Sequence, residues 1–137
     1  PGSVRFHPAK GVVVGNIGLH HGHAWPAPDV VACRQVVMGH NHPVIAFRDR
    51  VEKLHTAACW LRVPLVAGER YDEVGEELVI TPAFGELAGR TMNREPLTGF
   101  GPLLRNGYTN LEAARVESLD GLDFGELRHL MDLRLER

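Results

Sequence analysis

Apolar residues in the first third of the chain occur in short β-branched runs that end at glycine-rich or polar turns. The runs 12–14 and 17–19 are separated by the Gly-Asn pair 15–16, which predicts two short strands joined by a tight turn. A further run, 35–38, stops at Gly39 and predicts a buried strand. The beginning of the chain is therefore expected to contribute several short strands to one sheet.

The segment between the second and third of these strands has the features of a short helix. Pro28 suits the first helical position and Asp29 is favourable in the first turn, so we expect a helix from Pro28 to about Arg34. The stretch 24–39 spans 16 residues, which is long enough for a crossover between parallel strands. Strands 17–19 and 35–38 are thus predicted to lie parallel, with their carboxyl ends side by side.

Beyond residue 43 the pattern predicts a sheet-rich second part with little helix. Asn110 is expected to cap a short helical or strand segment within 109–116, and 122–135 reads either as a closing strand or as an amphipathic tail helix. The Gly-, Pro- and Arg-rich span 85–102 is expected to be an extended loop. The strand-forming runs of this part are 44–47, 53–66 and 77–80.

Five of the eight histidines fall within a window of 23 residues, from His20 to His42. Two His-x-His pairs, His21 with His23 and His40 with His42, directly follow predicted parallel strands. Their imidazoles are therefore expected to converge at one edge of the sheet. Neutral imidazole is the commonest metal ligand in proteins, so the spacing predicts a metal site.

The other histidines are interpreted as structural. His20 is expected to face away from His21, because successive side chains of an extended segment alternate. We assign no site role to His7, His55 or His129. His23 is placed near the site, either supporting a metal ligand from behind or facing the substrate.

Composition limits the remaining possibilities. A length of 137 residues suits one domain, and a net charge of −2 provides no bulk cationic field for a polyanion. Cys33 and Cys59 lie 26 positions apart without CxxC spacing, which favours neither a disulfide scaffold nor a cysteine zinc site. With no apolar run of about 18 residues, we expect a cytoplasmic protein that does not enter a membrane.

Two segments resemble motifs of a known superfamily. Residues 18–26, GLHHGHAWP, and 36–43, VVMGHNHP, look like the HGH and GHxH elements of the calcineurin-like metallophosphoesterases. The Trp-Pro pair after the first motif, with ACWL at 58–61, ITPAF at 80–84 and GPL at 101–103, is similar to the archaeal SbcD-related phosphoesterases. This resemblance covers nearly the whole chain.

The resemblance implies an α/β fold, part of a four-layer α/β/β/α sandwich, to which this chain would give mainly the second sheet. It implies two divalent metal ions, Mn first and Fe or Zn next. His21 and His40 would bind one ion and His42 the other. The implied activity is metal-dependent phosphodiester hydrolysis, with DNA as the expected substrate of a repair nuclease. The expected roles outside the metal ligands are catalysis for His23 and substrate binding for Asn41 and Arg90.

The superfamily's earlier motifs DxH, GDxxD or GDxxH, and GNHD or GNHE are absent from this sequence. They supply the carboxylates, and two adjacent dications repel strongly without one. Asp29 and Asp49 are the nearest acids and are expected to be solvated. We therefore interpret residues 1–137 as the C-terminal portion of a single domain that lacks its N-terminal motifs, with a strand already under way at 4–6. Alone, it would hold at most a weak, partial metal site.

Two other functions remain open. One is an inactive binding or scaffold module that keeps the fold, and the other is an unrelated His-ligated zinc-binding domain. The expected partners are a phosphoester substrate and either another protein or a second copy of the chain. Arg94 and Arg105, like Arg90, could meet substrate phosphates, although solvated loop arginines are the ordinary case. Trp25 and Trp60 are expected to serve in packing.

Overall fold

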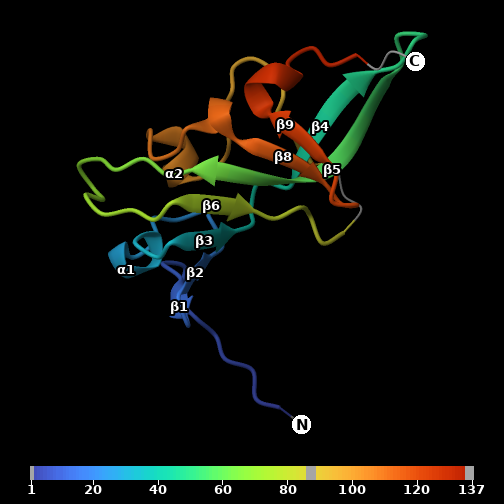
Figure 1. Ribbon diagram of the computed structural model, residues 1–137. Coiled ribbons are helices and arrows are strands. Elements are labelled where there is room, and N and C mark those ends of the chain that lie inside the picture. The colour runs from blue at the N-terminus through green and yellow to red at the C-terminus, as the bar shows by residue number, and fades with distance from the viewer. Residues whose placement is uncertain (1, 86–88, 135–137) are drawn as a thin grey trace.

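The computed structural model describes residues 2–85 and 89–134, and its strands join into one open sheet with few helices (Figure 1). The two short α-helices are α1 (Pro28–Val31) and α2 (Pro102–Arg105), and the two 3₁₀ turns are η1 (Leu111–Ala113) and η2 (Leu127–Leu130). The strands are β1 (Val12–Val14), β2 (Ile17–His20), β3 (Gln35–Met38), β4 (Pro43–Arg48), β5 (Leu54–Pro64), β6 (Glu77–Ile80), β7 (Arg90–Thr91), β8 (Arg115–Ser118) and β9 (Asp123–Glu126).

The strands follow the order β1-β2-β3-β6-β5-β4-β7, and a branch continues from β5 through β8 to β9. Strands β2, β3 and β6 are parallel, with His20 opposite Met38 and Met38 opposite Ile80. The two histidine motifs therefore leave the sheet from adjacent strands at the same edge. This confirms the predicted crossover.

One face of these strands is buried against the helices and turns. Val36 and Leu78 are fully buried, and they form one apolar core with residues of α1, α2, η1 and η2. Gly18 lies so close to α1 that a Cβ there would be 2.2 Å from the carbonyl oxygen of Val30. The helix and its strand can approach this closely only without a side chain at position 18.

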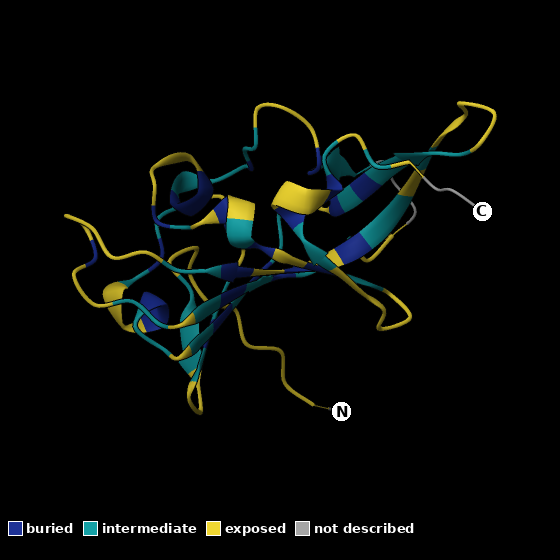
Figure 2. Ribbon diagram, turned by 45° about the horizontal axis from the view of Figure 1, so that its top comes forward, coloured by how far each residue is buried: buried dark blue, intermediate teal, exposed yellow. Residues whose placement is uncertain are grey.

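The opposite face of the same strands is more open. Val37 and Val79 are half-buried and Trp60 is 36% exposed. Together with the exposed Leu119 they line a shallow groove of about 330 Å³. Figure 2 also shows exposed residues along the N-terminal segment and at the tip of the β4–β5 hairpin. The sheet thus has one well-covered face and one partly open face, whose groove is lined by charged side chains such as Arg62 and Glu117 as well as by apolar ones.

The predicted strands near 12–14, 17–19, 35–38, 44–47 and 77–80 are confirmed, and the run 53–66 holds the 11-residue β5. The segment 109–116 forms a 3₁₀ turn and then a strand, and Asn110 precedes that turn without a side-chain cap. The tail combines both alternatives, β9 followed by η2, and position 135 lies outside the described residues. The expected loop 85–102 contains the two-residue β7, and positions 86–88 are outside the description.

Two local predictions are wrong. The helix ends at Val31 instead of near Arg34, because the carbonyls of Val31 and Arg34 accept hydrogen bonds from the segment that leads into β6. The expected strand at 4–6 is an extended, exposed segment without strand pairing, and Phe6 is 93% exposed.

The fold is mixed α/β, with a strand-rich open sheet and few helices. Within the described part of the chain, no helix has the length and apolar character needed to cross a bilayer.

Candidate functional site

The two histidine motifs meet beyond the carboxyl ends of β2 and β3. The amide of Gly39 donates a hydrogen bond of 3.1 Å to the carbonyl of His21, which ties the two turns together. The His21 and His40 rings lie 4.9 Å apart between centroids, in an edge-to-face arrangement. Side chains 19 positions apart in the sequence are thus neighbours because their strands are parallel.

His21, His23 and His40 form what we call the imidazole cluster. The ring centroids of His21 and His23 are 4.8 Å apart, and those of His23 and His40 are 6.2 Å apart. The Nδ1 atoms of His21 and His23 share a hydrogen bond of 2.8 Å, so one of these nitrogens donates and the other accepts. His21 and His23 are exposed to solvent, and His40 is partly covered.

The turn that carries the second motif has an uncommon backbone. His40 and His42 both adopt left-handed conformations, with φ of +69° and +47°. Such conformations are rare in residues other than glycine and are often found at functional sites. Gly101 also has a positive φ, and a Cβ there would lie 2.0 Å from the carbonyl oxygen of Gly22. The segment before α2 is therefore packed directly against the first histidine turn.

Asn41 holds this turn from within. It is 1% exposed, its Nδ2 donates to the carbonyl of Phe100 at 3.2 Å, and its Oδ1 accepts from the amide of Phe100 at 2.6 Å. Both ends of the side-chain amide are therefore used by the backbone of another loop. In this structure Asn41 positions Phe100 beside the cluster, and its substrate-binding role stays a prediction.

Burial and neighbouring positive charge disfavour the protonated form of His40. Desolvation lowers the pKa of His40, and the positive charges of His21, His23, His42 and Arg105 lower it further. A neutral imidazole has a free nitrogen lone pair for a cation or a proton.

His20 lies in the same surroundings. Burial, followed by the charges of His21 and His23, lowers the pKa of His20 to about 4. Both of its ring nitrogens are buried without a hydrogen-bond partner within the described chain. His20 and His21 both line one cavity of about 520 Å³ together with His23, and the expectation that His20 faces away from His21 stays a prediction. His7 also lines this cavity, because the N-terminal segment passes beside it.

His42 is placed differently from the cluster. It is exposed, and its main-chain carbonyl accepts a hydrogen bond from the amide of Arg90 at 3.0 Å. The structure therefore brings the rings of His21, His23 and His40 together, and His42 lies near enough to His40 for its charge to lower the pKa of His40.

The donor atoms of the site do not fit two metal ions on their own. Within residues 2–85 and 89–134, no three His, Cys, Asp or Glu side chains are placed to hold one ion. Asp29 is exposed on α1, and Asp49 is bonded to His55 at 2.8 Å in the β4–β5 hairpin. The site offers imidazoles without a nearby carboxylate, so it lacks the charge needed to hold adjacent dications.

The three arginines considered as phosphate contacts, which lie in β7, in α2 and between them, separate into two groups. Arg90 and Arg105 lie against the ring of Phe100, whereas the exposed Arg94 lines a cavity of about 560 Å³ with Phe47 and Met131. Phe100 is a site residue that was not predicted from the sequence. No pattern of charge or hydropathy in the sequence indicated the bonds between Asn41 and Phe100, because they join residues 59 positions apart.

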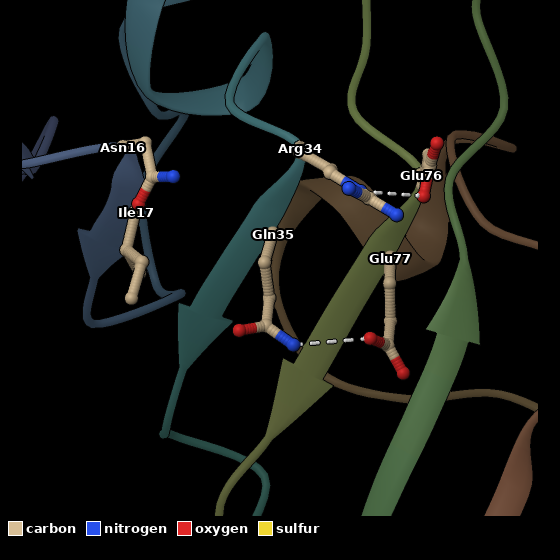
Figure 3. Close-up of a pocket in the computed structure, with 6 residues that line it drawn as sticks. All are labelled: Asn16, Ile17, Arg34, Gln35, Glu76 and Glu77. Atoms are coloured by element: carbon tan, nitrogen blue, oxygen red, sulfur yellow. Dashed lines mark hydrogen bonds and ion pairs between the residues drawn. The ribbon is translucent and has the colours of Figure 1, made fainter.

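Another hollow lies at the amino end of the parallel strands, away from the histidines. Figure 3 shows Arg34 paired with Glu76 at 3.0 Å and Gln35 donating to Glu77 at 3.1 Å. Asn16 and Ile17 complete the lining. The polar groups of Arg34, Gln35, Glu76 and Glu77 pair with one another, so this hollow has the character of a surface ion-pair network.

Comparison with known proteins gives no relative: no family model, no curated protein and no solved structure matches the chain.

Proposed function

We propose that this chain carries the histidine-rich part of a metal-dependent phosphoesterase that hydrolyses phosphodiesters, with DNA in a repair setting as the expected substrate. The observation that supports this most is the imidazole cluster, in which two turns after parallel strands bring three imidazoles within 4.8 to 6.2 Å of one another. Ligand sites of α/β sheets commonly lie at this edge.

In this proposal the metal ligands are those implied by the motifs. His21 and His40 bind one divalent ion, His42 binds a second, and His23 faces the substrate as a catalytic group. Mn is the first choice of metal, with Fe and Zn next, because the mixed oxygen and nitrogen ligands that the resemblance implies suit these ions better than Mg. The carboxylates must come from outside the described residues, since the site as described has none. A protein partner or a second copy of the chain is one source.

The partly open face of the sheet supports the finer proposal about architecture. Parallel strands are almost always covered on both faces, and here Val37 and Val79 are only half-buried. A second sheet packed on this face would give the two central layers of a four-layer α/β/β/α sandwich. We propose that residues 1–137 contribute the second of those sheets and form the C-terminal portion of one domain.

Hydrolysis of bis(4-nitrophenyl) phosphate in the presence of Mn²⁺ tests the activity directly. We expect weak hydrolysis by the purified chain and its loss in His40→Ala. The matched control is His129→Ala, because His129 is an exposed histidine of η2 and its loss should leave the rate unchanged. Equal rates for the wild type and His40→Ala would contradict the proposal.

The coding sequence upstream of Pro1 provides a test independent of activity. We expect an in-frame series of DxH, GDxxD and GNHD motifs within about 100 codons, a length that completes a typical domain. Unrelated sequence there would remove the carboxylates on which the catalytic proposal depends.

The imidazole-only donor set favours one alternative, a binding or scaffold module that kept the fold and lost catalysis. This alternative predicts no hydrolysis under any metal, with the fold unchanged in His40→Ala. A His-ligated zinc domain would instead show one tightly bound ion and cooperative unfolding on chelation. Metal analysis of the purified chain, followed by unfolding in EDTA, separates the two.

A further inference from the structure

Two arginines lie against one aromatic ring next to the imidazole cluster. The guanidinium carbon of Arg90 is 4.2 Å from the centroid of the Phe100 ring, and that of Arg105 is 5.5 Å from it. The Phe100 ring is itself 6.0 Å from the ring of His40. Contact with an aromatic face restrains a guanidinium without neutralising its charge.

Each of these side chains is fixed by one hydrogen bond that leaves its outer nitrogens available. Nε of Arg90 donates to the carbonyl of Thr98 at 3.3 Å, and Nε of Arg105 donates to the carbonyl of Gly99 at 3.4 Å. Neither arginine is paired with a carboxylate of the described chain, whereas five other arginines are. The free nitrogens of a guanidinium match two oxygens of a phosphate.

The segment that carries these groups is held in place. Asn41 bonds both the amide and the carbonyl of Phe100, and a Cβ at Gly99 would lie 3.0 Å from Oδ1 of Asn41. The two arginines are therefore attached to the same turn that carries His40.

We infer that Arg90 and Arg105 form a clamp that binds a phosphate group of the substrate beside the imidazole cluster. The identity of the substrate rests on the proposed function, but the binding of phosphate by the clamp does not. This phosphate could come from either of two sources, a free phosphate ion or the backbone of a nucleic-acid strand. The contacts with Phe100 select Arg105 over Arg94 as the partner of Arg90, and Phe100 and Asn41 are positioning residues.

Binding to the metal-free chain in EDTA tests the clamp without any hydrolysis. The two probes are a fluorescein-labelled oligothymidylate, measured by anisotropy, and inorganic phosphate, measured by calorimetry. We expect Arg105→Ala and Arg90→Ala each to weaken oligothymidylate binding about tenfold, as the loss of one charged hydrogen-bond pair implies. The slope of log K against log salt concentration should become less steep by about one for each variant.

The matched control is Arg94→Ala, which removes the same charge from the exposed segment between β7 and α2, away from Phe100. It should leave the affinity for oligothymidylate within twofold of the wild type. Arg105→Lys keeps the charge and loses the paired geometry, so it should fall between the wild type and Arg105→Ala. Circular dichroism of each variant checks that the fold is retained.

The results separate the two sources of phosphate. Weaker binding of both probes supports a clamp for a single phosphate, and weaker binding of oligothymidylate alone supports a clamp for a strand. The inference is overturned if Arg105→Ala binds the probes as tightly as Arg94→Ala does. It is also overturned if the wild type binds neither probe. Loss of binding in a chain without hydrolytic activity would sustain the clamp while the proposed activity fails.

Discussion

The side chain of Asn41 links the turn between His40 and His42 to the loop that holds Phe100. An asparagine amide can donate and accept at once, and here both functions are used on one peptide unit. The two neighbouring histidines have left-handed backbones, which cost free energy unless the surroundings compensate. Asn41 supplies part of that compensation, so it governs the geometry of the site from a buried position.

Replacing Asn41 by alanine should lower the free energy of unfolding by about 2 kcal/mol, because the buried amide and carbonyl of Phe100 lose their partner. Urea denaturation measures this change. Asn106→Ala is the control, since Asn106 is exposed and bonds only the carbonyl of Pro102, and should cost less than about 0.5 kcal/mol. Equal losses in the two variants would show that the buried contact contributes nothing special.

The two cysteines should differ sharply in reactivity. Burial raises the pKa of Cys59 to about 12, whereas Cys33 is partly accessible. Only the thiolate reacts with Ellman's reagent. The native protein should therefore give the absorbance expected for one reacted thiol, and the denatured protein the absorbance expected for two. A native Cys33→Ser variant should release none, and rapid reaction of that variant would mean that the strand carrying Cys59 opens readily.

For individual residues, the sequence predicted which histidines cluster but not what surrounds them. The clustering of His21, His23 and His40 followed from two strand ends and the length between them. The buried, unpartnered ring nitrogens of His20 could not be predicted from alternation alone, because they depend on the segments that pack around the end of β2 in the described chain. The partners of Asn41 and Arg105 depend on packing between distant segments, for which the sequence carries no periodic signal.

Among the elements, the β4–β5 hairpin has a built-in acid sensitivity at its turn. The Asp49 carboxylate accepts hydrogen bonds from His55 at 2.8 Å and from the amides of Val51 and Lys53 at 3.0 Å each. The bond to His55, with those to the two amides, lowers the pKa of Asp49 below its usual 3.8. The ionised carboxylate therefore stabilises the hairpin.

Because the pKa of Asp49 is lower in the folded protein than in the unfolded chain, its stabilising contribution is present above about pH 4 and is lost as the pH falls through the folded value. Asp49→Asn should accordingly reduce stability at neutral pH, and the difference from the wild type should shrink on acidification. Thermal unfolding at several pH values measures this. Asp72→Asn, in an exposed loop, should show no such converging difference, and a constant gap for Asp49→Asn would contradict the assignment.

Elements whose residues are β-branched and bounded by turns were predictable, as β2, β3 and β6 show. The end of α1 was not, because it is decided by the hydrogen bonds of the Val31 and Arg34 carbonyls to residues 75–77. Residues 75–77 can pair with the end of α1 because the backbone at Gly75 approaches it closely. A Cβ at Gly75 would lie 1.7 Å from the carbonyl oxygen of Cys33, which only glycine permits.

For the whole molecule, the difference between the two faces of the sheet leads to a paired prediction on β3. Val36→Thr places a hydroxyl in the core and should lower the free energy of unfolding by about 1–3 kcal/mol. Val37→Thr, one residue along on the open face, should change it by less than about 0.5 kcal/mol. Urea denaturation compares the two.

A comparable loss for both valines would mean that the open face is covered in solution. Sedimentation measured alongside would then identify a second copy of the chain as the cover. The mixed α/β class was predictable from alternating runs and a crossover length. The layer beyond the open face was not, because it depends on which surface packs there and not on the local pattern of this chain.

One strand connects the parts of this sheet. Residues 54–58 of β5 pair with β4, residues 59–62 with β8, and residues 61–64 with β6. Fraying at β1 or β9 therefore leaves the centre of β5 bonded, whereas exposure of that centre requires nearly global opening. Its amides should set the slow limit of hydrogen exchange, at the free energy of complete unfolding. The turns that carry the histidines follow β2 and β3, which lie nearer one edge of the sheet. We expect these turns to open in smaller fluctuations, during which the amides of the rest of the sheet do not exchange.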